Sequence, residues 1–113
     1  MNKKVYYSLL FAYYESLLTE KQKNLFNYYY NEDYSLGEIA EELGISRNAV
    51  WDALNKTTKL LDQYEENLKL YNNEKILKEN LDKLKAHCDD EGLEIIKKIE
   101  EMEWLNASWN FIR

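Results

Sequence analysis

The chain has 113 residues, of which 45% are hydrophobic and 32% charged, with three glycines and no proline. This composition excludes an intrinsically disordered chain, suits one compact domain, and favours an all-α fold because few residues break a helix. The net charge of −6 argues against a strong nonspecific hold on nucleic acid, and the single cysteine, Cys88, excludes an intrachain disulfide and fits a reducing cytoplasm.

The first predicted helix covers about Lys3 to Leu18. Its apolar positions recur at three- and four-residue spacing and are Tyr6, Leu9, Leu10, Tyr13 and Leu17. Lys3 and Lys4 before an apolar run resemble the start of a signal peptide, but the tyrosines in the run and the lack of a cleavage site favour a cytoplasmic helix. No run reaches the roughly 18–20 apolar residues of a membrane span, so no membrane insertion is predicted.

Two capping boxes mark the starts of the next two helices. Thr19 and Gln22 have the spacing of such a box, and the helix that they open should run to about Asn31. Ser35 and Glu38 have the same spacing and open a short third helix. This helix should end at Leu43, because Gly44 can supply the positive φ that a sharp turn requires.

The fourth predicted helix is long and begins after Ser46, a good N-cap residue. Its apolar positions are Val50, Leu54, Leu61, Tyr64, Leu68 and Tyr71. After Leu54 their spacing is partly heptad-like, which favours packing against a partner helix. Asn72-Asn73 is the predicted bend.

Helical pattern resumes through Ile76, Leu77, Leu81, Leu84 and Cys88. Asp89-Asp90 then caps a last helix that should turn Leu93, Ile96 and Ile99 inward. The tail holds Trp104, Trp109 and Phe111, which favours docking on the body or on another subunit. We therefore expect a helix-turn-helix domain at residues 1–72 and a helical C-terminal extension at residues 73–113.

The segment from Leu36 to Leu54 has the pattern of a helix-turn-helix. Two helices joined by a three- to four-residue turn that contains glycine define this motif. Ala40 should be small because the second helix crosses close to it, and Gly44 should turn the chain. The wedge between the helices should be filled by Ile39, Leu43, Ile45 and Val50. The alternative is an ordinary tight αα-hairpin.

In such motifs the first residues of the second helix reach base edges. The predicted contact residues for DNA or a partner are Arg47, Asn48, Trp51, Asp52, Asn55, Lys56 and Lys59. Arg47 could read guanine and Asn48 adenine. The alternative is a solvated or protein-contacting face, because Leu36 to Leu61 holds three basic residues against four acidic ones.

The sequence resembles the YlxM-type proteins of low-GC Gram-positive bacteria. The resemblance rests on the run from Asp33 to Glu42, on Ser46-Arg47, Ala49-Val50 and Asp52, and on Leu17 to Gln22, and it continues through Thr57, Leu61, Tyr64 and Glu65. It covers about residues 6 to 72. This chain departs from the family's pattern at Asn48, at Trp51 and at Asn55-Lys56, where one basic residue is lost.

This resemblance implies a fold like sigma-factor region 4, built on the structural positions Ser35, Ala40, Gly44, Ser46 and Val50, and a homodimer. It also implies a regulatory role in the signal recognition particle pathway, because the genes of the family neighbour those of the particle's GTPase and its receptor. The family also carries a DNA-binding label.

No catalytic apparatus is expected. His87 and Cys88 are adjacent, so on a helix they do not face each other, and no further histidine or cysteine completes a metal site. We predict no enzyme activity and no cofactor. Two hypotheses remain, namely an adaptor that contacts protein or ribonucleoprotein near the particle, and a transcription regulator that reads a palindromic site as a dimer. Because the chain is acidic, we expect any DNA binding to be weak.

Overall fold

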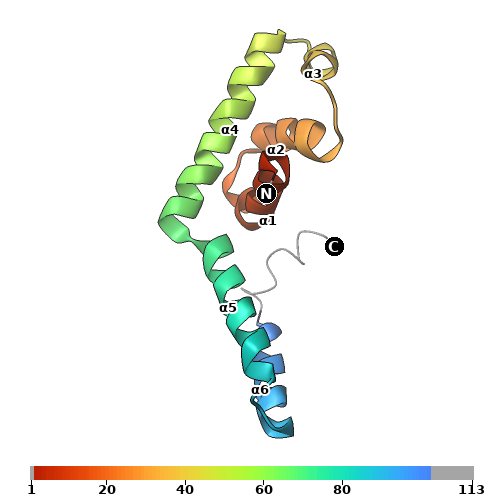
Figure 1. Cartoon of the computed structure of the whole chain (residues 1–113). Coiled ribbons are helices and arrows are strands. Elements are labelled where there is room, and N and C mark those ends of the chain that lie inside the picture. Colours follow the sequence, from red (N-terminus) through yellow and green to blue (C-terminus); the bar gives the residue numbers. More distant parts are fainter. Residues whose placement is uncertain (1, 103–113) are drawn as a thin grey trace.

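The computed structural model describes residues 2–102, which form an all-α fold without a strand in that range. The α-helices are α1 (Lys3–Tyr14), α2 (Glu20–Phe26), α3 (Leu36–Leu43), α4 (Arg47–Leu68), α5 (Leu70–Lys85) and α6 (Asp90–Glu100). A 3₁₀ turn covers Glu15–Leu17 and a π-helical turn covers Asn27–Asn31. Helices α1 to α3 gather along α4, while α5 and α6 form a hairpin that extends from one end of α4 (Figure 1).

An aromatic core holds α1 against α4. Its buried members are Leu10, Phe11, Tyr14, Leu18, Phe26 and Leu61. The rings of Phe11 and Phe26 stack at 4.4 Å between centroids. The predicted first helix is too long, because α1 ends at Tyr14 and the 3₁₀ turn rotates the following side chains. Leu17 is consequently 52% exposed, whereas Leu18 is buried.

The second predicted helix has the expected extent but not a uniform geometry. The Thr19 hydroxyl accepts a hydrogen bond from the Gln22 backbone N–H, and the Gln22 side chain accepts one from the Thr19 N–H, so the capping box is present. The last turn is π-helical, and the Glu32 N–H donates to the Asn27 carbonyl. This wider turn changes the direction of the Tyr28-Tyr29-Tyr30 side chains relative to a regular α-helix.

The break after α4 lies at Lys69, not at the predicted Asn72-Asn73. Lys69 adopts a left-handed conformation with φ +56°, and α5 begins at once. The heptad-like half of α4 does pack against a helix, but that helix is α1 of the same chain, since Leu61 belongs to the aromatic core. This intrachain contact removes one reason to expect a partner helix there.

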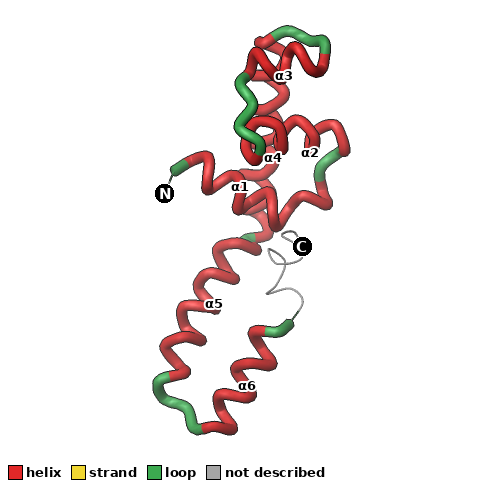
Figure 2. The backbone as a smooth tube through the Cα atoms, turned by 90° about the vertical axis from the view of Figure 1, so that its right-hand side faces the viewer, coloured by secondary structure: helices red, strands yellow, loops and turns green. Residues whose placement is uncertain are grey.

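Helices α5 and α6 form an antiparallel hairpin that reaches away from the rest of the chain (Figure 2). Asp89 caps α6 as predicted, and its carboxylate accepts from the Gly92 N–H. Of the three residues expected inward on α6, Ile96 is buried but Leu93 is exposed. The radius of gyration is 17.7 Å, against about 13 Å for a compact globule of this length. The division into residues 1–72 and 73–113 stays a prediction.

No helix within residues 2–102 is both long enough and apolar enough to cross a membrane. The predicted docking of Trp104, Trp109 and Phe111 lies outside the described residues.

Candidate functional site

The helix-turn-helix is assembled by local hydrogen bonds at its three corners. The Ser35 hydroxyl accepts from the Glu38 N–H at 3.0 Å, and the Glu38 carboxylate accepts from the Ser35 N–H at 3.1 Å. Gly44 ends α3 with φ +67°, and its N–H donates to the Ala40 carbonyl. The Ser46 hydroxyl accepts from the Ala49 N–H at 3.0 Å and so starts α4. These caps set where α3 begins and ends and where α4 begins.

The wedge between α3 and α4 is filled differently from the prediction. Ile39, Ala40 and Val50 are buried there, together with Leu54 and with Leu25 from α2. Leu43 and Ile45 are each 41% exposed, so neither fills the wedge as expected. They flank Gly44, whose left-handed conformation turns the chain at the tip of the motif. The tip therefore presents two apolar side chains to solvent.

Arg47 does not extend freely from the start of α4. Its guanidinium lies against Gly37 on α3, where a β-carbon added to that glycine would be 2.7 Å from Arg47 Nη2. Gly37 in the first turn of α3 leaves the room that this side chain uses. A contact from Arg47 to a base would first require the guanidinium to leave α3.

The other predicted contact residues either line one of two pockets or are exposed on the surface of α4. Trp51 and Asn55 line an open pocket of about 410 Å³ between α4 and the start of α1. Lys56 and Lys59 line a separate depression of about 300 Å³, beside Gln22 of α2. Asn48 and Asp52 are exposed on the helix surface. Trp51 and Asn55 thus lie toward α1, and Lys56 and Lys59 lie toward α2. Whether the seven residues act as one contact surface stays a prediction.

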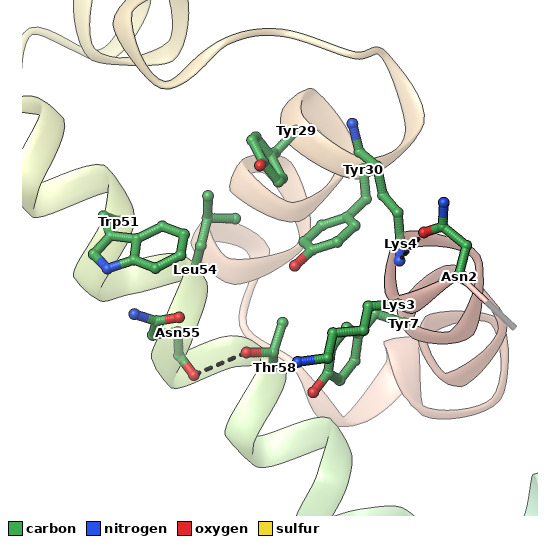
Figure 3. Close-up of a pocket in the computed structure, with 10 residues that line it drawn as sticks. All are labelled: Asn2, Lys3, Lys4, Tyr7, Tyr29, Tyr30, Trp51, Leu54, Asn55 and Thr58. Carbon is green, nitrogen blue, oxygen red and sulfur yellow. Dashed lines mark hydrogen bonds between the residues drawn. The ribbon is translucent and has the colours of Figure 1, made fainter.

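The pocket of Trp51 and Asn55 includes residues that the sequence analysis did not single out as contacts (Figure 3). Lys3, Lys4 and Tyr7 come from α1, and Tyr29 and Tyr30 come from the π-helical turn. Burial and the hydrogen bond from its hydroxyl to Asp62 raise the pKa of Tyr7 to about 12, so this hydroxyl stays a donor at neutral pH. The sequence motifs predict no contact between these two lysines and α4, because only the packing of α1 along α4 brings them together.

The outer face of α3 is acidic. Tyr34, Glu38, Glu41 and Glu42 line a notch of about 420 Å³. In a DNA complex of this motif the first helix crosses the phosphate backbone. Carboxylates at this position repel phosphates, which opposes the usual docking geometry.

The described part of the chain holds no cluster of three or more histidine, cysteine, aspartate or glutamate side chains arranged to bind a metal ion. His87 is exposed at the turn between α5 and α6, and Cys88 is half-buried. The Cys88 side chain packs closely on Gly92, where an added β-carbon would lie 2.8 Å from Cys88 Cβ.

Residues 1–102 match the family described as "Putative helix-turn-helix protein, YlxM / p13 like". The UPF0122 protein YlxM of Bacillus subtilis is 48% identical over 99 residues, which is 86% of this chain and 90% of that protein. A UPF0122 protein of Lactococcus lactis is 44% identical over 98 residues, or 86% of each chain. One from Shouchella clausii is 40% identical over 108 residues, covering 91% of this chain and 99% of its own. The similarity therefore extends past residue 72, the end of the range expected from the sequence motifs.

Proposed function

We propose that this chain, which belongs to the UPF0122 family of YlxM/p13-like helix-turn-helix proteins, is a non-enzymatic cytoplasmic adaptor. In this proposal its fold, like that of sigma-factor region 4, serves as a scaffold. The partner is a protein or ribonucleoprotein of the signal recognition particle pathway, as the family resemblance suggests. The protein then regulates the pathway by occupying a surface of that partner.

The observation that carries this proposal is the tip of the helix-turn-helix. Leu43 and Ile45 are exposed there, at the end of α3 that also carries Glu41 and Glu42. Exposed apolar side chains rimmed by charged ones are typical of a protein contact site. The same carboxylates would face the phosphates of a bound duplex. The tip thus suits a protein surface better than DNA.

The alternative is a transcription regulator that reads a palindromic DNA site as a dimer. In its favour, Ser46 caps α4 as in a recognition helix, and Asn48, Asp52 and Lys56 are exposed along it. Arg47 could join them if its guanidinium left Gly37, and it would then contribute about 1–3 kcal/mol of discrimination at a guanine. Lys56 would meet phosphate instead.

Two variants separate these functions. We expect Ile45→Asp to weaken binding to the purified signal recognition particle GTPase, with or without its RNA, by about tenfold or more, because loss of an apolar anchor costs that much at an interface. Arg47→Ala should leave this affinity unchanged. Duplex DNA from the protein's own promoter should bind only in the nonspecific range of about 10⁻⁴–10⁻⁶ M at physiological salt.

Both affinities are measured by titration at several salt concentrations, and Glu66→Ala on the exposed face of α4 is the control. A nanomolar DNA complex that Arg47→Ala abolishes would establish the regulator in place of the adaptor. Failure of the particle components to bind at any salt concentration would remove the proposed partner.

We also propose that the protein is a homodimer that pairs through the α5–α6 hairpin. Ile76 and Leu84 on α5 are each 48% exposed, and Ile95 on α6 is 53% exposed. The aromatic side chains of α1 and Leu61 in the heptad-like half of α4 pack within the chain instead. The hairpin is therefore where a second copy would bury the most apolar surface.

We expect sedimentation at micromolar concentration to give twice the 13.6 kDa chain mass. The double variant Ile76→Glu/Ile95→Glu should sediment as a monomer with unchanged helical circular dichroism, because both side chains are exposed within one chain. Leu17→Glu, at an equally exposed residue of the 3₁₀ turn, should stay dimeric. A monomeric unaltered chain would contradict the dimer, and a dimeric double variant would place its interface elsewhere.

A further inference from the structure

We propose that the pocket between the start of α1 and the middle of α4 binds a single nucleotide, with its base against Trp51 and its phosphate at Lys3. The ligand is either a free nucleotide or an unpaired nucleotide of a single-stranded chain. This inference goes beyond the adaptor function and does not rest on it, since it concerns a different surface from the tip at Leu43 and Ile45.

The charge of the pocket selects an anion. The chain carries 21 acidic residues and 15 basic ones, yet two lysines and no carboxylate line this cavity. Lys4 is engaged, because its ammonium pairs with Asp33 at 3.0 Å and lies 4.8 Å from the centre of the Tyr29 ring. Lys3 is exposed and forms no ion pair with any residue from 2 to 102. Lys3 is therefore the cation available to a phosphate.

The walls of the pocket suit a planar ring. Trp51 is 49% exposed on the α4 side, while Tyr7 and Tyr30 lie on the opposite side (Figure 3). Leu54 contributes an apolar surface beside Trp51. Stacking of a base on an aromatic side chain is favourable for every base, because each presents a π-face. A volume of about 410 Å³ falls in the usual range for small-molecule sites, roughly 300–1,000 Å³.

One polar side chain could read the edge of the ring. Asn55 lies one helical turn after Trp51 and lines the same pocket. Its backbone carbonyl accepts from the Thr58 hydroxyl at 3.1 Å, but its side-chain amide has no hydrogen-bond partner among residues 2–102. An asparagine amide pairs with two adjacent polar atoms of adenine. Asn55 is therefore placed to pair with the edge of an adenine whose ring lies against Trp51.

Duplex DNA does not fit this site. A base that is paired and stacked presents only its edge in a groove, whereas the pocket offers aromatic faces. Only an unstacked base can contact Trp51 with its ring face. Trp51 and Asn55 therefore suit contact with an unpaired base better than the reading of paired bases in the major groove.

The test follows the fluorescence of Trp51 in the full chain, with Trp104→Phe and Trp109→Phe to remove the other two tryptophans. We expect adenosine monophosphate to quench this fluorescence saturably and adenosine to bind more weakly. Inorganic phosphate should not quench it. Lys3→Gln should lower the affinity for the monophosphate about fivefold or more but leave that for adenosine unchanged, because a phosphate contact is lost. Lys21→Gln, an exposed lysine of α2 away from the pocket, is the charge control and should bind like the parent chain.

Because Trp51→Ala lacks the fluorophore, the affinity of this variant for adenosine monophosphate is measured by calorimetry in the otherwise unaltered chain. Its affinity should fall about tenfold or more, as expected for one stacked base. Binding of a single-stranded adenine octamer but not of the monophosphate would identify the source as an unpaired nucleotide in a chain, and the reverse would identify a free nucleotide. Equal affinity for the octamer and for its duplex, or no binding of either ligand at millimolar concentration, would overturn the proposal.

Discussion

Ala40→Glu is expected to unfold the protein or to leave it severely destabilised, whatever its function. Ala40 is 8% exposed and packs with Ile39, Val50 and Leu54 where α3 meets α4. A glutamate there would place an unpaired charge between two helices, and no cation of the described residues lies in that cluster. The cost should be on the order of 4 kcal/mol, a large part of the about 5–15 kcal/mol by which domains are stable.

Gly44→Val tests the same motif through the backbone and should cost less. The glycine has φ +67°, but no atom outside its own neighbours lies within 4 Å of an added β-carbon. The penalty is therefore conformational alone, about 1–2 kcal/mol and more for a β-branched residue. Gly44→Asn should cost less than valine, since asparagine tolerates the left-handed region.

Urea denaturation followed by circular dichroism measures both effects. The control is Ala49→Glu, the same substitution at an exposed residue of α4. Its side chain would stand three residues after the Ser46 cap and complete a capping box, so stability should be unchanged or slightly higher. If Ala40→Glu and Gly44→Val both unfolded at the same urea concentration as the parent chain, the helix-turn-helix assignment would be wrong.

Glu65→Ala is expected to destabilise the junction of α4 and α5 by about 2–3 kcal/mol, because it removes several hydrogen bonds to a charged group. The Glu65 carboxylate accepts from the backbone N–H groups of Tyr71 at 3.1 Å and Asn72 at 3.0 Å. It also accepts from the Tyr14 hydroxyl at 2.6 Å. The carboxylate thus caps the first turn of α5 from the last turn of α4, and its charge favours the helix N-terminus.

Tyr14 completes this junction from α1. Its hydroxyl accepts from the Leu70 N–H at 3.0 Å while it donates to Glu65. Burial, followed by the hydrogen bond to Glu65, raises the pKa of this hydroxyl well above its usual range, so it remains a donor at neutral pH. Tyr14→Phe would leave the Leu70 N–H without its partner and should cost about 1–3 kcal/mol.

The free energy of unfolding is measured for Glu65→Ala, Tyr14→Phe and the double variant. The double variant should lose less than the sum of the two single losses, because both act on one hydrogen-bonded group. Glu66→Ala, at an exposed neighbour in the same turn, should stay within about 0.5 kcal/mol of the parent chain. Strict additivity, or an equal loss in Glu66→Ala, would show that these bonds do not hold the junction.

The starts and ends of most helices could be predicted because their causes are local. Thr19, Ser35, Ser46 and Asp89 each bond to a backbone N–H three residues ahead, and the residue type with its spacing is visible in the sequence. Gly44 is predictable for the same reason, since a left-handed residue after an apolar helix is most often glycine. The family resemblance is also visible in the sequence, because it rests mainly on the segments that contain the Ser35 and Ser46 caps.

The features that decide the candidate sites depend on contacts between distant segments, so the sequence alone did not determine them. Lys69 has no local tendency to break a helix, and its left-handed conformation is supported by Glu65 and by Tyr14 from α1. Leu43 and Ile45 look like wedge residues by spacing, but both are exposed, and the buried cluster includes Leu25 of α2 instead. Likewise, Lys3 and Trp51 meet at one pocket only because α1 packs along α4. Local hydrogen-bonding chemistry therefore determined the elements, while packing between helices decided which side chains face solvent together.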